Sequence, residues 1–569
     1  MEMRTLSGSG LKVSALHIEA ALYHGKMQES MSAEGFAMFP RTQVTFKTED
    51  AKLQQLYDTA VRKCLNNLNT FAGDQVLVEG GGYEKIWLET QPMGGEMYAK
   101  HNLTAALNNH LLFMRHQRED GRIAGSIKLI SEVGQCPTNE SDCLHSPSVA
   151  SAVPQGAVMA EFNKFQGFCF PWSALNMYYW IGEDHQYLDQ LADCLERFDA
   201  YLWKMRDSNG DGILESWCVY DTGEDNAVRY GNSPVYCTED VPPEGCDIVP
   251  MASMDVTSFS YACRDTLAEI SLIRGDMAGH KKWRRLADEV ADVIGEKLWD
   301  DKRGACFDKD KHGNVINVLC HNTLRCMYWG SISKYMADRF VQEHLLNPEE
   351  FWTPCPLPSM AVNDPAFRNA VENNWSGQCE GLTYQRAILA LERYGYEKIV
   401  TQLGKKLFDV VSKGGLLFVQ QFDPFTGAPS IVDPETKEPL PPDTDQEEVG
   451  QRPTSGSDRL HIAPQSPRQA AGLGRAEIQD SYGPTLLSVL EYIAHIWGVT
   501  MVRGQIWFSL GSGAPYTYEQ VWGENTYRIE SDGKDARIFV NGMEKHRAKC
   551  GVRLATDKAG RLLYQRNIE

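Results

Sequence analysis

One stretch of the sequence concentrates groups that can transfer protons. The run YDTGEDNAVRY, at positions 220–230, holds four ionisable side chains within nine positions: Asp221, Glu224, Asp225 and Arg229. A solvated surface loop would have this composition. A carboxylic acid held beside an arginine in a binding pocket would have it too. The sequence does not say which neighbour faces Asp225, so both interpretations stay open at this point.

Carboxylates and aromatic rings also recur in other segments that the helical patterns leave as loops. Aromatic rings stack on the faces of sugars, and carboxylates accept hydrogen bonds from sugar hydroxyls. The 13 tryptophans of the chain suit this use, although any one of them could equally be a core residue. The candidate substrate-binding residues from these loops are Trp87, Glu89, Glu96, Trp172, Trp217, Arg229, Trp375, Asp423 and Tyr482.

Two carboxylates on opposite sides of a cleft can hydrolyse a glycosidic bond. One of them, protonated, gives its proton to the leaving oxygen, and the other takes a proton from water. The acid needs a raised pKa, which burial or a neighbouring negative charge provides. Asp225 has Glu224 beside it in sequence and Arg229 four positions later, and these neighbours act in opposite directions.

Helical patterns that end in loops with Asp and Gly recur along the chain and must position these side chains. They cover residues 53–72, 99–125, 174–216, 255–307, 322–346, 381–418 and 482–499. In one of them, positions at helical spacing form a single apolar face made of Val256, Phe259, Cys263, Leu267 and Ile270. The second helix of each pair is richer in charge, which is typical of an outer layer.

Helix pairs repeated about six times favour a mainly α fold, an (α/α)6 toroid of six inner helices ringed by six outer ones. An open solenoid is the alternative, but the repeats differ in length and their loops differ strongly. We expect the loops after the inner helices to converge at the mouth of the toroid, where long unequal loops carry function.

The hydrophobic pattern of the sequence changes from helical to alternating after about Val499. Short alternating runs split by Gly, Asp and Asn predict strands and hairpins. We therefore predict an N-terminal segment at 1–45, a helical barrel at 46–499 and a small β domain at 500–569. Residues 435–475 form a polar loop rich in Pro and Gly that could act as a lid.

Charge and cysteine usage narrow the partners and the compartment. The chain has 56 Lys and Arg against 76 Asp and Glu, a net charge of −20, which disfavours nucleic acid and anionic membranes. The charged start of the chain is not expected to act as a signal peptide, the sequence has no long apolar run, and its 15 cysteines show no C-x-x-C spacing. We expect a cytoplasmic protein with a small carbohydrate substrate, without cofactor or metal; a homo-oligomer is compatible with the sequence.

Two short runs contain residues that are common in ion-binding loops. The run DSNGDGILE, at 207–215, resembles a calcium loop, but Cys218 stands where an EF-hand needs its last ligand, so calcium binding is left open. The glycines of VEGGGYE, at 78–84, lack the G-x-x-x-x-G-K-[ST] spacing of a phosphate-binding loop.

Several motifs, in order along residues 80–500, resemble those of the trehalase and glycoside hydrolase family 63 group of six-hairpin glycosidases, including mannosylglycerate hydrolases and processing glucosidases. TGEDNAVRYGNSPV is similar to their Gly-x-Asp-x-Ser/Ala-x-Arg loop, and MDVTSFSY to the Asp-led inner helix that follows it. NNWSGQCEGLTYQRA resembles their Trp-x-Gly-Pro-x-Trp helix start, and QQFDPFTG their Glu-x-Tyr-Asn/Asp-Pro-x-Thr-Gly segment.

The resemblance implies an inverting glycosidase with Asp225 at the general-acid position. It implies that Arg229 holds substrate or tunes that acid. Asp255 would open the next inner helix and bond backbone or sugar, and Trp375 would line the pocket. MGGEMYAKHN, at 93–102, is similar to a helix start of rhamnosidases. This similarity leaves open an enzyme that acts on other terminal sugars, such as rhamnose.

One departure from the family pattern concerns the base. Gln420 stands where the family has its Glu general base, and an amide does not take a proton from water at neutral pH. Four interpretations stay open: an engineered Glu-to-Gln change, a base that has moved, phosphate in place of activated water, or sugar binding without cleavage. Glu380, Asp423 and Glu477 are candidates for a moved base, and a helix start would keep Glu380 ionised.

The sequence thus predicts an inverting exo-glycoside hydrolase for a small glycoside or disaccharide, with Asp225 as acid and the base left open because Gln420 occupies the family's Glu position. A glycoside phosphorylase or an α-L-rhamnosidase-like enzyme on the same barrel is the alternative within enzymes. A catalytically inactive carbohydrate-binding protein is the alternative outside them.

Overall fold

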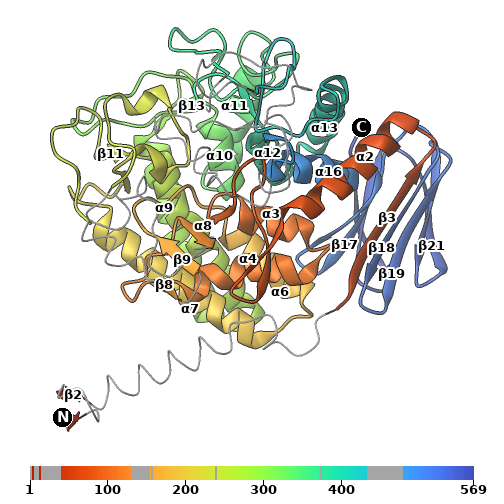
Figure 1. The fold of residues 1–569 in the computed structure, drawn as a ribbon, viewed down its shortest axis with the longest axis horizontal. Coiled ribbons are helices and arrows are strands. Elements are labelled where there is room, and N and C mark those ends of the chain that lie inside the picture. Colours follow the sequence, from red (N-terminus) through yellow and green to blue (C-terminus); the bar gives the residue numbers. More distant parts are fainter. Residues whose placement is uncertain are drawn as a thin grey trace.

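A computed structural model describes residues 40–129, 158–237, 240–371, 375–431 and 479–569 of the chain. It also gives the backbone of three short strands, β1 (Met3–Thr5), β2 (Lys12–Ser14) and β8 (Pro154–Gln155). Figure 1 shows a helical body with a β-rich part beside α2 and α16.

The helical body consists of helix pairs. The first members are α3 (Gln91–Tyr98), α6 (Pro171–Trp180), α8 (Met254–Ile273), α10 (Asn322–Trp329), α12 (Gly381–Glu392) and α16 (Gly483–Trp497). Their packing partners are, in the same order, α4 (Leu103–Arg115), α7 (His185–Met205), α9 (Met277–Lys297), α11 (Lys334–Phe340), α13 (Glu397–Lys413) and α2 (Ala51–Cys64). A short π-helical segment, Val341–Leu345, follows α11.

The first members of the pairs form a closed ring. Each contacts the next along the chain, and α16 contacts α3, so the series returns to its start. Every residue of α16 is buried, whereas α9 buries only Ala287, Val290 and Ile294. The prediction of a helical toroid with inner and outer helices is therefore confirmed, and the open solenoid is wrong because its ends would not meet.

Local sequence explains where these helices begin. Ser253 caps α8 by accepting the backbone N–H of Val256 at 3.3 Å, and Asp276 caps α9 through the N–H groups of Ala278 and Gly279. The apolar face expected on α8 is buried at all five positions, with at most 3% of any side chain exposed. Tertiary packing of this stripe supplies most of the stability of such a helix.

Two antiparallel sheets follow the last helix. One has the order β16-β17-β22-β23 and the other the order β21-β20-β19-β18-β3. Strand β3 (Thr42–Thr48) comes from before the helices and pairs with β18 along its whole length. The remaining strands are β16 (Val499–Val502), β17 (Gln505–Leu510), β18 (Tyr516–Trp522), β19 (Asn525–Ser531), β20 (Asp535–Val540), β21 (Met543–Lys549), β22 (Val552–Thr556) and β23 (Leu562–Asn567).

Short strands organise the loops at one end of the toroid. A four-stranded sheet with the order β6-β7-β9-β8 contains β6 (Lys85–Trp87), β7 (Ser126–Leu129) and β9 (Val158–Glu161). Antiparallel two-stranded pairs are β4 (Leu68–Phe71) with β5 (Asp74–Leu77), β10 (Glu215–Ser216) with β11 (Met251–Ala252), β12 (Trp299–Asp300) with β13 (Ala305–Cys306), and β14 (Cys379–Glu380) with β15 (Gln421–Phe422).

Some expectations fall on other parts of the chain. The lid-like loop at 435–475 and Glu477 lie outside the described residues, as does most of the segment 1–45. None of the helices that the structure describes combines the length and apolar character needed to cross a membrane.

Candidate active site

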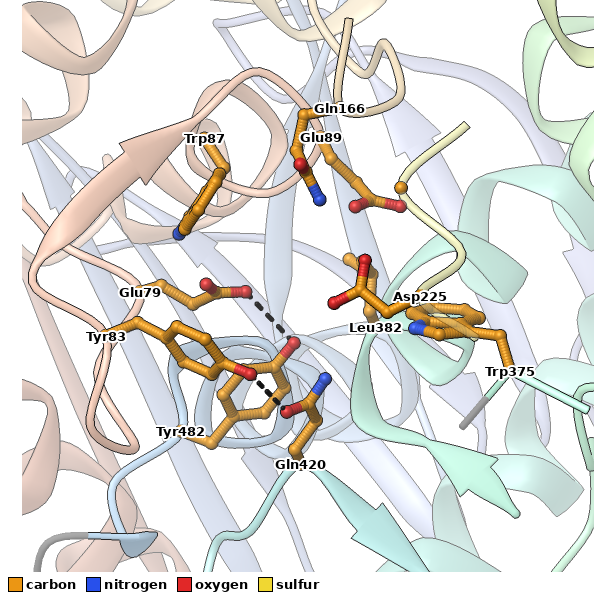
Figure 2. Close-up of a pocket in the computed structure, with 11 residues that line it drawn as sticks. Glu79, Tyr83, Trp87, Glu89, Gln166, Asp225, Trp375, Leu382, Gln420 and Tyr482 are labelled. Atoms are coloured by element: carbon orange, nitrogen blue, oxygen red, sulfur yellow. Dashed lines mark hydrogen bonds between the residues drawn. The ribbon is translucent and has the colours of Figure 1, made fainter. Parts of the chain in front are cut away.

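A small pocket lies at the N-terminal ends of the inner helices. Figure 2 shows the side chains that surround it. The lining residues are Glu79, Tyr83, Trp87, Glu89, Gln166, Gly223, Asp225, Trp375, Leu382, Gln420 and Tyr482.

The pocket corrects the expectation about which loops form the mouth. Glu89 precedes α3, Asp225 precedes α8, Trp375 precedes α12, and Tyr482 is the residue before α16. The site is thus built from loops that lead into the inner helices, not from loops that follow them. Helix N-termini present backbone N–H groups and the positive end of the helix dipole, which favour negatively charged or oxygen-rich partners.

Three carboxylates of the run 220–230 have three different surroundings. Asp221 accepts the backbone N–H groups of Phe165 at 3.1 Å and Trp217 at 2.8 Å and pairs with Arg206. Burial opposes its ionisation, but Arg206 outweighs burial and holds the pKa of Asp221 below its usual range. Asp221 therefore fastens the loop, while Asp225 projects into the pocket (Figure 2).

Glu224 and Arg229 belong to a buried ion network behind the Asp225 loop. Arg229 pairs with Glu224, with Asp308 and, at 3.0 Å, with Asp255. Arg325 pairs with Glu224 at 3.0 Å and with Asp255 at 2.8 Å. These five side chains are at most 3% exposed.

The charges of this network balance one another. Burial opposes ionisation of Glu224, but Arg229 and Arg325 hold its pKa well below the usual range. Burial raises the pKa of Asp308 to about 6 despite Arg229. Burial also lowers the pKa of His321, which contacts Glu224 at 2.8 Å, so this imidazole is neutral. Neither Arg229 nor Asp255 is among the described residues that line the pocket, and the substrate contacts expected of them remain predictions.

The wall carrying Trp375 is fastened to the Asp225 loop by backbone bonds. The Trp375 N–H donates to the Asp225 carbonyl at 3.0 Å, and the Val228 N–H donates to the Ser376 hydroxyl at 2.7 Å. Figure 2 shows Trp375 beside Asp225 and Trp87 across the pocket. Two indole rings thus flank the space in front of the Asp225 carboxyl group, as expected of a sugar site.

Glu89 is enclosed between two glycines. Side chains added at Gly167 or Gly223 would meet its carboxylate or stem, and Arg386 pairs with it. Burial, opposed by Arg386, raises the pKa of Glu89 to about 7. This carboxyl group therefore changes charge near neutral pH while remaining in the pocket wall.

The wall on the other side of the pocket carries two hydrogen-bonded pairs. The Tyr482 hydroxyl donates to Glu79 Oε1 at 3.0 Å, and the Tyr83 hydroxyl donates to Gln420 Oε1 at 2.9 Å (Figure 2). Burial and then the charge of Glu79 raise the pKa of Tyr482 well above its usual value. Tyr482 is therefore a neutral hydrogen-bond donor to Glu79 at any ordinary pH.

Two predicted residues lie in a second pocket. Glu96 and Trp172 line this pocket, which lies near the C-terminal ends of α3, α12 and α16 and beside α6. Glu96 accepts hydrogen bonds from Asn176 at 2.6 Å and Trp180 at 2.8 Å, and Arg503 lies over the Trp172 ring. The structure does not bring Glu96 and Trp172 together with Asp225.

Three more predicted residues lie outside the pocket lining. Trp217 is 1% exposed and donates to Glu215 at 2.8 Å. Asp423 accepts the backbone N–H groups of Phe425 and Thr426 at 2.9 and 2.8 Å, as turn-forming aspartates do. Glu380 is 0% exposed within the β14–β15 pair, next to the backbone that carries Gln420.

Glu79, Tyr83, Gln166 and Leu382 are pocket residues that sequence reasoning missed. Glu79 and Tyr83 lie in the run VEGGGYE, whose glycines were the sequence signal for this part of the pocket. Gly80 and Gly81 adopt positive φ angles of 75° and 62°, and a side chain at Gly81 would meet Tyr482. These glycines let Glu79 and Tyr83 approach the start of α16 closely.

Among the described residues, no three His, Cys, Asp or Glu side chains are arranged to hold a metal ion. In the calcium-like run, Asp207 accepts the Gly212 N–H at 3.2 Å, and Ser208 donates to Glu215. These side chains thus make hydrogen bonds within their own turn.

Comparison with known proteins gives the family of the chain. The model of the mannosylglycerate hydrolase MGH1-like glycoside hydrolase domain matches residues 98–437. The chain therefore belongs to this family of glycoside hydrolases. The predicted relationship to the trehalase and mannosylglycerate hydrolase group of glycosidases is confirmed.

Individual relatives are distant. A probable trehalase from Eremothecium gossypii is 25% identical over 173 residues, 26% of this chain, and the match spans only 23% of that relative's length. One similar crystal structure is that of a glycoside hydrolase family 63 mannosylglycerate hydrolase from Thermus thermophilus in complex with glucose. It superposes with a TM-score of 0.51 at 17% identity, and the match covers 66% of this chain and 95% of that one. A sialidase structure superposes with a TM-score of 0.59 at 13% identity, over 95% of this chain and 45% of that one. At such identities the two structures support the fold alone.

Proposed function

We propose that this member of the family is an inverting, exo-acting hydrolase of a small glycoside or disaccharide, with Asp225 as its general acid. The observation that carries the proposal is the position of Asp225. Its carboxyl group points into a small aromatic-walled pocket that holds further carboxylates on other walls (Figure 2). This is the arrangement that glycoside hydrolysis with two carboxylic groups requires.

The chemistry divides between two walls of the pocket. Asp225 in its protonated form gives its proton to the glycosidic oxygen, so that the leaving group departs as an alcohol. Water attacks the anomeric carbon from the opposite face and loses a proton to a base, which inverts the configuration. The aromatic rings of Trp87 and Trp375 would hold the terminal sugar between these groups.

Substrate size follows from the pocket. A small pocket walled by side chains from several loops suits a terminal sugar with a short aglycone better than a polysaccharide chain. The family is named after mannosylglycerate hydrolase, and one relative is a probable trehalase, so both names point to small glycosides. The proposal therefore covers a terminal hexose joined to a small acid, polyol or second sugar.

The finer description of the architecture is part of this proposal. The ring of six first-member helices with six outer partners corresponds to the (α/α)6 toroid, here assigned to residues 46–499. The two sheets after Val499 would form a small β domain at 500–569 that takes in β3 as an additional strand. The pairing of β3 with β18 supports a fixed attachment of this domain to the barrel.

The glutamine at position 420 leaves two alternative functions open. Gln420 lies in the pocket, where the family has its base, so phosphorolysis without a base and binding without cleavage both remain competing functions. An α-L-rhamnosidase-like specificity would change the sugar but not the chemistry.

The test is hydrolysis of a panel of disaccharides, glycerate glycosides and aryl glycosides, with and without phosphate, by this chain and by Asp225→Asn and Gln420→Glu. We expect hydrolysis without phosphate and, by proton NMR, a first product of inverted configuration. Asp225→Asn should lose about 10² to 10⁴ in kcat/KM on alkyl glycosides and much less on dinitrophenyl glycosides, whose departure needs no acid. A product of retained configuration, or equal losses on both substrate classes, would refute the assignment of Asp225.

A further inference from the structure

We propose that Glu79 is the base that activates water in this enzyme, in place of the carboxylate that Gln420 lacks. This inference rests on the proposed hydrolytic function and adds a catalytic residue to it. The reasons are the position of Glu79, its hydrogen bonding and the surroundings of the other carboxylates.

Glu79 lies across the pocket from Asp225. Figure 2 shows the two carboxyl groups on opposite sides of the open space, with Trp87 and Trp375 flanking it. Both side chains are nearly buried, at 6% and 8% exposure. An inverting reaction places a sugar and a water molecule between its two carboxyl groups, with the water on the face opposite to the acid.

The backbone around Glu79 fixes its position. Its N–H donates to the Lys85 carbonyl at 3.1 Å, and its own carbonyl accepts the Gly483 N–H at 2.5 Å. A side chain at Gly483 would collide with that carbonyl, so the close approach needs glycine there. The carboxylate is therefore anchored at the start of α16 and needs no rearrangement to act.

The hydrogen bond from Tyr482 favours the charge state that a base needs. A hydroxyl that donates to a carboxylate stabilises its ionised form. Because burial keeps Tyr482 protonated, this donor is present throughout the working pH range. A carboxylate carries several lone pairs on its two oxygens, so Glu79 can accept this hydrogen bond and also take a proton from water.

Gln420 has a supporting role in this arrangement. Its Oε1 accepts the hydroxyl of Tyr83, and Figure 2 shows its amide nitrogen on the pocket side of the residue. A donor at this position can hold the oxygen of the attacking water while Glu79 removes a proton. Gln420 is thus a positioning residue.

The other carboxylates fit the role of base less well. Glu89 pairs with Arg386, and its pKa is raised to about 7, so it is partly protonated at neutral pH. Glu380 is completely buried, and Asp423 binds the backbone of its own turn. Among the described residues that line the pocket, the acidic ones are Glu79, Glu89 and Asp225.

Hydrolysis in this pocket breaks one bond to the anomeric carbon, forms another and moves two protons. The water oxygen forms a bond to the anomeric carbon as the bond from that carbon to the glycosidic oxygen breaks. One water proton passes to the Glu79 carboxylate, and the Asp225 proton passes to the leaving oxygen. The products are a hemiacetal of inverted configuration and an alcohol, and exchange with solvent then returns one proton from Glu79 and one to Asp225.

The experiment compares Glu79→Gln, Glu79→Ala and the control Asp225→Asn on dinitrophenyl and alkyl glycosides, with and without sodium azide. We expect both Glu79 variants to lose about 10² to 10⁴ in kcat/KM on both substrate classes, because water activation is needed whatever the leaving group. Glu79→Ala should form an inverted glycosyl azide, since azide fills the vacated space and attacks without losing a proton. The acidic limb of the wild-type pH profile should disappear in both variants.

The outcomes separate the two proposals. Wild-type hydrolysis with Glu79→Gln retaining kcat/KM within about threefold would overturn Glu79 as base while leaving the hydrolase intact. Glycosyl azide formed by Glu89→Ala but not by Glu79→Ala would also overturn it. Turnover by the wild type only with phosphate, or sugar binding without turnover, would overturn the hydrolase and this inference together. Glu79→Gln keeps the size of the side chain and a hydrogen bond to Tyr482, so its melting temperature and sugar binding, followed by tryptophan fluorescence, show that lost activity is not lost folding.

Discussion

The crowding of Glu89 between two glycines makes Gly223→Ala a sharp test of the pocket. Gly223 has a φ of +75°, and a Cβ built on it would lie closer to the Glu89 carboxylate than real Cβ atoms come to their neighbours. Glu89 has little room to withdraw, because the backbone of Gly167 already approaches its stem so closely that a Cβ there would lie 3.1 Å from it. The substitution must therefore displace Glu89 from Arg386 or move the Asp225 loop.

The magnitude has two parts. Placing a non-glycine residue at a left-handed φ costs about 1 to 2 kcal/mol. Breaking the buried pair between Glu89 and Arg386 costs up to about 3 to 5 kcal/mol, because it leaves a buried charge without compensation. A matched control is Gly210→Ala, since Gly210 has a φ of +72° and no atom within 4 Å of its added Cβ. The control measures the backbone cost alone.

The assay is urea unfolding of both variants, followed by kcat/KM on the best substrate. We expect Gly210→Ala to lose about 1 to 2 kcal/mol with full activity. Gly223→Ala should lose at least about 2 kcal/mol more, with kcat/KM reduced at least tenfold. Equal stability losses for the two variants would refute the reasoning, because they would show that Glu89 is displaced without cost.

Three further changes test other parts of the structure. Arg206→Met should destabilise the protein by about 3 to 5 kcal/mol in urea unfolding, because Asp221 would stay buried without its cation; a loss below about 1 kcal/mol would contradict this. The pKa of Glu89 is raised from 4.5 to about 7 on folding, so its contribution to stability is greatest below pH 4.5 and falls as the pH rises to 7. Relative to Glu89→Gln, the wild type should therefore lose on the order of 3 kcal/mol of unfolding free energy between pH 4.5 and 8. If the difference in unfolding free energy between the two proteins does not change with pH, Glu89 keeps its ordinary pKa. Tyr482→Phe should lower kcat about tenfold and shift the acidic limb of the pH profile to higher pH, because Glu79 loses a donor that stabilises its charge. An unchanged acidic limb would show that the hydrogen bond from Tyr482 does not tune the base.

The helical architecture was largely predictable because it depends on local patterns. The stripe Val256, Phe259, Cys263, Leu267 and Ile270 repeats at helical spacing, and its burial in α8 follows from that spacing alone. The pairing of β3 with β18 was not predictable in this way. It joins segments more than 460 positions apart, and no local signal in residues 42–48 selects that partner.

The site was predictable where a motif carries it and not where distant loops combine. Asp225 and Trp375 were identified from their sequence context, and both line the pocket. The partners of Arg229 include Asp308, 79 positions away, and a sequence pattern within one loop does not contain this information. Glu96 lies near the C-terminal end of α3, away from the pocket, because the site is built from loops that lead into the inner helices. Trp172, in the first turn of α6, lines the same second pocket, and its position in sequence does not show this.

The arginine four positions after Asp225 now has a physical interpretation. An arginine beside a general acid would keep it ionised and unable to donate a proton. Here the charge of Arg229 is compensated by Glu224, Asp255 and Asp308 in a network that is at most 3% exposed. The network fixes the loop, and its carboxylates offset the positive charge that Arg229 would otherwise present to the pocket. The density of charge in residues 220–230 therefore serves two purposes, since Asp221 and Glu224 pair with arginines to fix the loop and Asp225 is turned toward the pocket.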